Sequence, residues 1–330
     1  MTQSDRKLIS FIIPVFNEDG NIQRCYDSIT TMMDTLSDRY DYELIFTDNH
    51  STDGSFVQLQ QLAQQDERVK VLRYSKNFGH QRSVYTGYAH SSGDIAVQID
   101  SDLQDPPELV PEFVRLWEEG YKVVYGVRKT RKEGWVINKV RHIFYRFINL
   151  ISEDELPLDA GDFRLVDWRV VEELCKVEDY QPFLRGTIAT MGFEQIGVPY
   201  DRQERVWGES KVPLTVMVRI ALDGVLNHSV APLRFAVYTG LLVSVVALGL
   251  LVGFLASRLW FGQEWPAGFA TTTILILMSI TLNAFFLGII GEYLGRIYRQ
   301  GKHRPMVVIE EELNISRKDG AEKYTASRQR

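Results

Sequence analysis

Two long stretches without a charged residue constrain the fold of this chain most strongly. They run from Phe235 to Ser257 and from Trp265 to Gly291 in a chain of 330 residues. Each is longer than the roughly 20 apolar residues that a helix needs to cross a bilayer. The connector Arg258–Glu264 is short, so the sequence predicts two transmembrane helices, at about 235–257 and 266–291, joined as a hairpin within residues 233–295. A hairpin buried in a soluble protein is the alternative.

The charges beside these stretches predict the orientation in the membrane. Basic residues follow the second stretch, namely Arg296, Arg299, Lys302 and Arg304, whereas the connector carries only Arg258. The positive-inside rule therefore places the tail 296–330 in the cytoplasm, and with it residues 1–210. We expect an integral membrane protein with both termini in the cytoplasm, most simply at a bacterial inner membrane. From Glu310 to Arg330 the tail is charged and poor in large apolar residues, which predicts a mobile or peripheral segment.

Composition excludes several other classes of protein. The formal net charge of −6 provides no basic excess for nucleic-acid backbones, so no nucleic-acid partner is expected. The two cysteines, Cys25 and Cys175, form neither a zinc spacing nor a disulfide framework, which favours a reducing compartment. The polar start, Met1–Lys7, leads directly into an apolar run, so we expect no cleavable signal peptide.

Residues 1–210 show the alternation of strands and helices that is typical of an α/β domain. Runs of strand length are Leu8–Val15, Tyr42–Thr47, Val69–Tyr74 and Ile95–Ile99, and the helical patterns between them are Asn21–Leu36, Ser55–Gln65 and His80–His90. This spacing predicts βαβ units, with a parallel sheet covered by helices on both faces. Residues 211–232 are expected to form an amphipathic segment next to the membrane.

Polar residues follow each of the four predicted strands. They are Asn17 and Glu18, the turn-rich stretch Asp48–Ser55, the stretch Ser75–Gln81, and a carboxylate pair after Ile99. In parallel sheets, ligands collect at the carboxyl ends of the strands. One such stretch is ordinary turn chemistry, but four in succession predict a nucleotide site.

The carboxylate pair Asp100 and Asp102 predicts a metal site. Side chains at positions i and i+2 of an extended segment point the same way, so both carboxylates can reach one divalent cation, with the Gln104 amide oxygen as a third ligand. A site with few protein ligands suits Mg²⁺ or Mn²⁺ whose coordination is completed by a substrate diphosphate.

Several motifs resemble the polyprenyl-phosphate glycosyltransferases of glycosyltransferase family 2. This group includes bacterial bactoprenol glucosyl transferases and dolichyl-phosphate mannose synthases. The motifs are IIPVFNE (12–18), TDNHSTDGS (47–55), SKNFGHQ (75–81), DSDLQDPPE (100–108), GDFRL (161–165), FLRG (183–186) and RVWGESK (205–211). The resemblance implies a Rossmann-like GT-A catalytic domain followed by the transmembrane hairpin. The pair Asn49-His50 departs from the small turn residues common in relatives, which bears on the contact with base or ribose.

The resemblance also implies roles for the residues of the donor site. Pro14, Phe16, Glu18 and Asp48 would hold the nucleobase and ribose of a nucleotide sugar. Asp100 would serve the ribose or the metal, and Asp102 and Gln104 the metal. Lys76 lies near enough in sequence to assist the diphosphate, although an exposed loop lysine is an equal alternative. Arg202, Arg205 and Lys211 form a late basic cluster that could close over the diphosphate, with ordinary solvated charge as the alternative.

A second basic region is expected to hold the acceptor. Arg128, Arg131 and Lys132 are the candidates for its phosphate, because guanidinium forks match phosphate oxygens. The segment Trp135–Ile151 mixes basic and large apolar residues like a helix in the membrane interface, or else is a packed surface helix. Asp162, and after it Asp159, are candidates for the base or a sugar-hydroxyl contact; pairing with Arg164 is the alternative for Asp162.

Together these features predict a metal-dependent enzyme that transfers one sugar, with inversion, to polyprenyl (undecaprenyl) phosphate. Glucose from UDP-glucose is the expected donor sugar, with galactose, an aminoarabinose derivative and mannose as alternatives. A different lipid or protein acceptor, or a membrane-tethered nucleotide-binding regulator without turnover, remain open. The small residues of the two spans favour a homo-oligomer in the lipid membrane.

Overall fold

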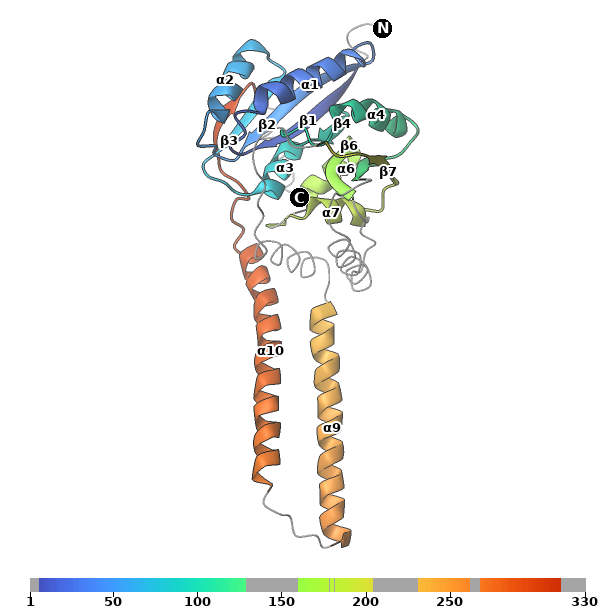
Figure 1. Cartoon of the computed structure of the whole chain (residues 1–330), viewed down its shortest axis with the longest axis vertical. Coiled ribbons are helices and arrows are strands. Elements are labelled where there is room, and N and C mark those ends of the chain that lie inside the picture. Colours follow the sequence, from blue (N-terminus) through green and yellow to red (C-terminus); the bar gives the residue numbers. More distant parts are fainter. Residues whose placement is uncertain are drawn as a thin grey trace. The chain divides into compact units, whose positions relative to one another are not determined.

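The computed structural model describes residues 6–128, 160–177, 179–180, 182–203, 231–261 and 268–315. The chain forms two compact units, each with most of its contacts within itself. The first comprises residues 1–145, 154–213 and 304–330, and the second comprises residues 146–153 and 214–303. Figure 1 shows the described part of the first unit as a sheet with helices on both faces, and that of the second as the long helices α9 and α10.

The first unit is built on an eight-stranded sheet in the order β7-β5-β6-β4-β1-β2-β3-β8. Its strands are β1 (Lys7–Val15), β2 (Tyr40–Asp48), β3 (Val69–Tyr74), β4 (Ile95–Gln98), β5 (Val123–Arg128), β6 (Ala160–Asp167), β7 (Gln195–Tyr200) and β8 (Ile309–Leu313). The four strands expected from the sequence form a continuous parallel group, β4-β1-β2-β3. The predicted parallel sheet is therefore confirmed for these four strands, but the complete sheet is mixed, because β6 is antiparallel to β4 and β5, and β8 is antiparallel to β3.

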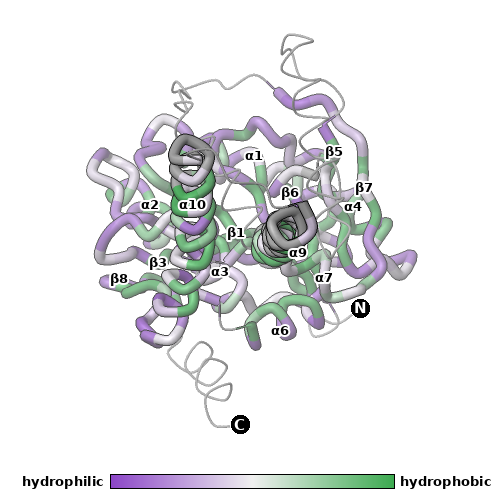
Figure 2. Tube along the Cα trace, turned by 90° about the horizontal axis from the view of Figure 1, so that it is seen from below, coloured by the Kyte–Doolittle hydropathy of each residue, from purple (hydrophilic) through white to green (hydrophobic). Residues whose placement is uncertain are grey.

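Helices cover both faces of this sheet, as predicted. They are α1 (Ile22–Asp34), α2 (Ser55–Gln65), α3 (His80–Ala89), the short 3₁₀ helix η2 (Pro107–Leu109), α4 (Val110–Glu118), α6 (Trp168–Lys176) and α7 (Leu184–Thr190). Alternate residues of β1 face opposite ways: Phe11 packs in the core with α1, α2 and α4, while Ile12 packs in the core with α3, α6 and α7. In this unit, hydrophilic segments gather toward the periphery (Figure 2).

The close packing of α3 on β1 depends on Gly87. A Cβ at this position would lie 2.3 Å from Cγ2 of Ile12, which is closer than atoms can approach. The missing side chain therefore lets α3 lie directly on the strand. This contact places His80, the first residue of α3, at the end of β4 beside Asp100.

A buried polar network joins strands β1, β2 and β3 in their N-terminal halves, away from the carboxyl ends that carry the polar loops. Glu43 is 4% exposed, and its carboxylate accepts hydrogen bonds from Ser10 Oγ at 2.5 Å and Ser92 N at 2.8 Å. Lys70 Nζ lies 2.5 Å from Glu43 Oε2, so the buried negative charge has a cationic partner. Burial of a carboxylate requires such compensation, because an isolated charge loses its hydration.

The chain after α10 returns to the sheet, which corrects one expectation from the sequence. Residues from Glu310 onward were expected to be mobile or peripheral, yet Ile309–Leu313 forms strand β8 and pairs with β3. Asn314 secures its end: its side-chain nitrogen donates to the carbonyl oxygens of Ala63 at 2.6 Å and Val69 at 2.9 Å. The three consecutive glutamates of β8 give no strand signal in the sequence, and an edge strand can carry them because it buries only part of its surface.

Replacing Asn314 with Ala should therefore loosen the return of the chain. The change removes two donors from carbonyls of the α2–β3 connection, and we expect a loss of about 1–2 kcal/mol of stability. Thermal unfolding of the purified protein in detergent measures it. Glu312→Ala, which truncates an exposed side chain of the same strand, should have a smaller effect. Equal midpoints for both variants would show that Asn314 does not anchor β8.

The described part of the second unit consists of α9 (Ala231–Phe261) and α10 (Phe269–Gly301). The first expected span, 235–257, lies within α9, and the second lies in α10 from Phe269 onward. Among the described residues, Met278–Gly301 is long and apolar enough to cross a membrane. The first expected span, which lies within α9, and the pairing of the two helices as a hairpin stay predictions.

Candidate functional site

A cavity of about 340 Å³ lies where the four parallel strands end. The loops after β1, β2, β3 and β4 all line it, through Pro14, Val15, Phe16, Glu18, Asn49, Asn77, Gly79, His80, Asp100, Ser101 and Asp102. The structure thus brings together residues from all four polar stretches that follow the predicted strands. The volume is in the range of small-molecule sites.

The loops that form the cavity are tied to one another by hydrogen bonds. Asn17 N donates to Ser51 Oγ at 3.0 Å, and Glu18 N donates to Ser55 Oγ at 2.8 Å, so the loops after β1 and β2 are held together. Phe78 N donates to Asn49 Oδ1 at 3.3 Å, which joins the loop after β3. A framework of this kind keeps the cavity open in a fixed shape before a ligand binds.

The carboxylates of Asp100 and Asp102 both line this cavity. His80 Nε2 lies 3.2 Å from Asp100 Oδ1, and Gln104 N donates to Asp102 Oδ1 at 3.1 Å. Burial alone would raise the pKa of Asp100, but the His80 contact and the charges of Arg128 and Arg202 hold it below its ordinary value. Asp100 is therefore an anion in a site that already attracts cations.

The donor set fits a hard divalent cation that takes most of its ligands from substrate. Two carboxylates open onto the cavity, and hard cations prefer oxygen ligands. In the described part of the chain no three His, Cys, Asp or Glu side chains form a metal cluster. The side chain of Gln104 is not among the groups that line the cavity, and its backbone oxygen accepts a hydrogen bond from Gln203 N at 3.0 Å. Its role as a third ligand stays a prediction.

Asp48, at the end of β2, does not itself line the cavity but directly precedes Asn49, which does, and it offers an unsatisfied acceptor there. It is fully buried; Oδ1 accepts from Ser51 N at 3.0 Å, whereas Oδ2 is buried without a hydrogen-bond partner in the described structure. Burial raises the pKa of this carboxyl group above its usual value. Because a buried unpaired oxygen is costly, a ligand N–H would stabilise this group, which fits the predicted contact with a nucleobase.

Two arginines lie near the carboxylate pair. Arg128, the last residue of β5, donates from Nε to the Tyr200 hydroxyl at 3.2 Å and places Nη2 3.5 Å from Asp105 Oδ2. Arg202 follows β7, and its Nε lies 3.8 Å from Asp105 Oδ1. Lys76 is placed differently: its Nζ lies over the Phe78 ring, 5.1 Å from the centroid, and Lys76 does not line the cavity. Its diphosphate role stays a prediction.

Asp162 lies on β6, which pairs with β5 in the sheet. It is half-buried, and its negative charge contributes to a raised pKa of His80, so the two residues are within electrostatic range. The Arg164 guanidinium bonds the backbone oxygens of Gly161 and Asp162 rather than the Asp162 carboxylate. The predicted contact of Asp162 with sugar or acceptor stays a prediction.

Several predicted site residues lie outside the described residues. They are Asp159, Arg131, Lys132, Arg205 and Lys211, together with the interfacial segment 135–151 and the juxtamembrane segment 211–232.

Three residues without a predicted role lie in or beside the site. His80 contacts Asp100, while Asp105 and Tyr200 contact Arg128. His80 lies in the motif SKNFGHQ and Asp105 in DSDLQDPPE, so their positions after strand ends were a usable signal. Tyr200 carries no such signal, because its contacts depend on the arrangement of β5 and β7.

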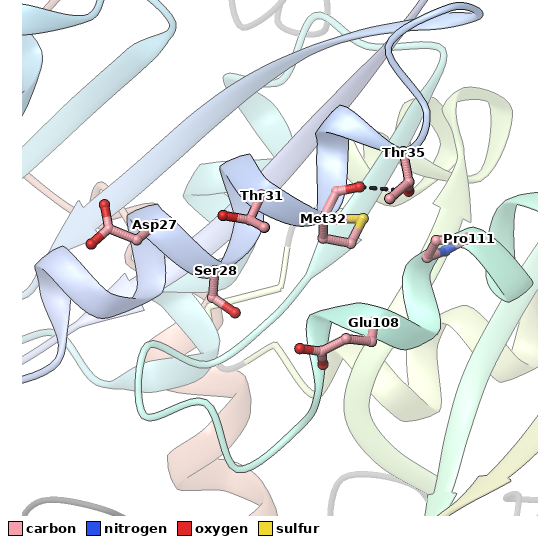
Figure 3. A pocket seen from close by; sticks show the side chains of 7 residues that line it. All are labelled: Asp27, Ser28, Thr31, Met32, Thr35, Glu108 and Pro111. Carbon is pink, nitrogen blue, oxygen red and sulfur yellow. Dashed lines mark hydrogen bonds between the residues drawn. The ribbon is translucent and has the colours of Figure 1, made fainter.

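A second hollow, of about 500 Å³, lies between α1 and the η2–α4 segment. Figure 3 shows Asp27, Ser28, Thr31, Met32 and Thr35 of the α1 region opposite Glu108 and Pro111. Its lining contains two carboxylates but neither a basic nor an aromatic side chain. It therefore lacks the groups that recognise phosphate or a base, and the cavity at the strand ends is the better nucleotide site.

Comparison with known proteins identifies the family. The model of glycosyl transferase family 2 matches residues 10–175. An uncharacterized glycosyltransferase, YkcC of Bacillus subtilis (strain 168), is 37% identical over 94% of this chain and 95% of its own. The bactoprenol glucosyl transferase of Shigella phage SfV is 32% identical over 92% of this chain and 98% of its own.

Among solved structures, glucosyl-3-phosphoglycerate synthase from Mycobacterium tuberculosis is 20% identical over 67% of this chain and 76% of that one, with a TM-score of 0.46. The family match and the two long sequence similarities are what establish membership. The chain therefore belongs to glycosyltransferase family 2, and it is a glycosyltransferase with a GT-A catalytic domain.

Proposed function

We propose that this enzyme transfers a single glucose from UDP-glucose to a polyprenyl phosphate at the cytoplasmic face of a membrane. The observation that carries the proposal is the cavity at the strand ends: a carboxylate pair lines it, the unsatisfied acceptor of Asp48 precedes its lining residue Asn49, and the charges of two arginines act on Asp100. The similarity to bactoprenol glucosyl transferases over most of the chain supports the choice of glucose and of a polyprenyl acceptor.

The donor would bind with its base at Asp48 and its diphosphate at the carboxylate pair. Asp48 Oδ2 accepts a base N–H, and the exposed ring of Phe16 provides an apolar contact in the cavity. Asp100 and Asp102 would hold Mg²⁺ or Mn²⁺, which supplies a Lewis acid for the leaving diphosphate. The His80 contact fixes one oxygen of Asp100 and so orients the carboxylate.

The acceptor phosphate would bind at Arg128. A lipid phosphate is already ionised near neutral pH, so its oxygen can attack without a strong general base. The main task of the enzyme is then to bring two anions together, and the positive charges of Arg128 and Arg202 lower the repulsion between them. Direct attack on the sugar carbon in one displacement inverts its configuration.

Chain connectivity supports a catalytic domain on the same side of the membrane as the end of α10. The connector from Lys302 to Val308 reaches at most about 25 Å when extended, less than the roughly 30 Å of a hydrocarbon core. It leads into β8, which pairs with β3 of the catalytic sheet. Since Arg296, Arg299 and Lys302 favour the cytoplasm, the catalytic domain belongs there too.

A panel of nucleotide sugars tests the proposal most directly. The purified full-length protein in detergent is mixed with undecaprenyl phosphate, Mg²⁺ or Mn²⁺, and radiolabelled UDP-glucose, UDP-galactose, a UDP-aminoarabinose derivative or GDP-mannose. We expect chloroform-soluble label chiefly from UDP-glucose, with release of UDP and as a lipid-linked monosaccharide. Transfer only to diacylglycerol, or no transfer from any donor, would contradict the proposal.

Arg128→Ala should weaken binding of the acceptor more than that of the donor. Loss of a charged hydrogen bond to phosphate predicts a rise of about tenfold or more in the KM for lipid phosphate. Steady-state kinetics with either substrate varied measures the two KM values. Arg115→Ala is the control, because Arg115 pairs with Glu112 on the solvent-exposed face of α4. A larger change in the KM for the donor would show that Arg128 binds the nucleotide sugar instead of the acceptor.

A further inference from the structure

Asp105 is a buried carboxylate that connects three segments of the catalytic domain. It follows the Asp-x-Asp motif and is only 1% exposed. Three groups surround it: the Tyr200 hydroxyl donates to Oδ1, Arg128 Nη2 lies 3.5 Å from Oδ2, and Arg202 Nε lies 3.8 Å from Oδ1. These groups come from β5, β7 and the residues just after β7, so the carboxylate joins elements far apart in the sequence.

Tyr200 transmits this arrangement to Arg128. Its hydroxyl donates to Asp105 and accepts from Arg128 Nε at 3.2 Å, so one oxygen orients both side chains. The Tyr200 ring packs against Gly126, where a Cβ would lie only 2.6 Å from Cε1 of Tyr200, so a side chain there would displace the ring. The Phe163 ring packs edge-on against Tyr200, with the two centroids 6.1 Å apart. The tyrosine is therefore held by packing as well as by hydrogen bonds.

The contacts leave part of the Arg128 guanidinium for a ligand. Nε donates to Tyr200 and Nη2 faces Asp105, while Nη1 has no hydrogen-bond partner in the described part of the chain. Arg128 also lies beside Gly161, whose Cβ position would be 3.7 Å from Nε, next to Asp162. A guanidinium that is anchored along one edge presents its remaining donors in one direction, which suits an incoming phosphate oxygen.

We propose that Asp105 and Tyr200 are positioning residues, which hold Arg128 in the orientation that binds the phosphate of the acceptor. The inference rests on the proposed function, because it takes a lipid phosphate as the anion at Arg128. Without the anchor, the long arginine side chain samples other rotamers, and phosphate binding must order it again at an entropic cost. Asp105 also offsets the repulsion between Arg128 and Arg202, so both cations can lie near one site.

Asp105→Asn tests the proposal, because it removes the charge and keeps the shape. We expect the KM for undecaprenyl phosphate to rise about tenfold, while the KM for the nucleotide sugar changes less than about twofold. Tyr200→Phe should act in the same direction, and it keeps the ring packing if Asp105→Asn folds poorly. In an Arg128→Ala background, Asp105→Asn should add no further increase, because Asp105 acts through Arg128.

Asp167→Asn is the matched control. Asp167 is also a buried carboxylate, bound by Trp117 Nε1 at 2.7 Å and Lys122 Nζ at 2.9 Å, but it pairs with the start of β4, away from the cavity. This variant should lower the unfolding midpoint and leave both KM values unchanged. A purely structural role for Asp105 predicts the same pattern in Asp105→Asn, and that result would overturn the proposal.

The outcomes separate this inference from the proposed function. If the unmodified enzyme glycosylates no lipid phosphate, the proposed function fails. If it does so and Asp105→Asn and Tyr200→Phe keep the acceptor KM, or if the effects of Asp105→Asn and Arg128→Ala simply multiply, only the positioning role fails.

Discussion

Asp102→Asn should lower kcat about a thousandfold or more while the protein stays folded and inserted in the membrane. The carboxylate lines the cavity beside Asp100, and in the proposed function it is the residue committed to the metal alone. An amide keeps the size of the side chain but loses the negative charge that a divalent cation needs. The hydrogen bond from Gln104 N at 3.1 Å can still form with the amide oxygen, so the loop should keep its conformation.

The assay for Asp102→Asn is the release of nucleoside diphosphate with saturating donor and lipid phosphate. Circular dichroism and the unfolding midpoint check the fold. Asp41→Asn, on the surface beside Arg6, is the control and should keep full activity. Retained turnover in Asp102→Asn, or full activity of the unmodified enzyme in excess EDTA, would show that the carboxylate pair does not act through a metal.

Glu43→Ala should destabilise the catalytic domain more than any surface change. Glu43 is 4% exposed, and its carboxylate joins Ser10, Lys70 and Ser92, so its removal leaves a cation and three donors without this acceptor. Breaking a buried ion pair by removing one partner costs about 3–5 kcal/mol. For a domain of this size we expect the unfolding midpoint to fall by roughly 10 °C.

Thermal unfolding of the full chain in detergent measures this loss. Glu43→Gln keeps the hydrogen-bond geometry without the charge and should fall between the unmodified protein and Glu43→Ala. Glu112→Ala is the surface control, because its ion pair with Arg115 lies on the solvent-exposed face of α4; the unfolding midpoint of this variant should hardly change. A Glu43→Ala protein as stable as the control would mean that the network contributes nothing net to folding.

The order of the first four strands and three helices was predictable because their signals are local. Apolar runs of strand length and helical periodicity are each contained in a short stretch of chain, and β1 to β4 and α1 to α3 lie close to their expected bounds. The polar stretches after these strands were predictable as one site for a related reason. Neighbouring parallel strands have their carboxyl ends at the same end of the sheet, so the loops that follow them lie close together.

The strands that make the sheet mixed were not predictable in the same way. β6 runs against β4, and β8 joins β3 from the other end of the chain, after the long helix α10. Pairing of this kind depends on which edges are left open once the central strands have formed. The charged pattern of β8 gives no sign of it, since its stability comes from backbone hydrogen bonds and from Asn314.

By itself, the sequence determined the class of this protein: an α/β glycosyltransferase domain with an acidic pair at a strand end, followed by long uncharged segments. Runs, periods and motifs carry that information because each is contained in a short piece of chain. Only the tertiary structure decided which partners the charges have. Asp105 meets Tyr200 and Arg128, and Glu43 meets Lys70, because the sheet brings distant strands within a few ångströms of one another.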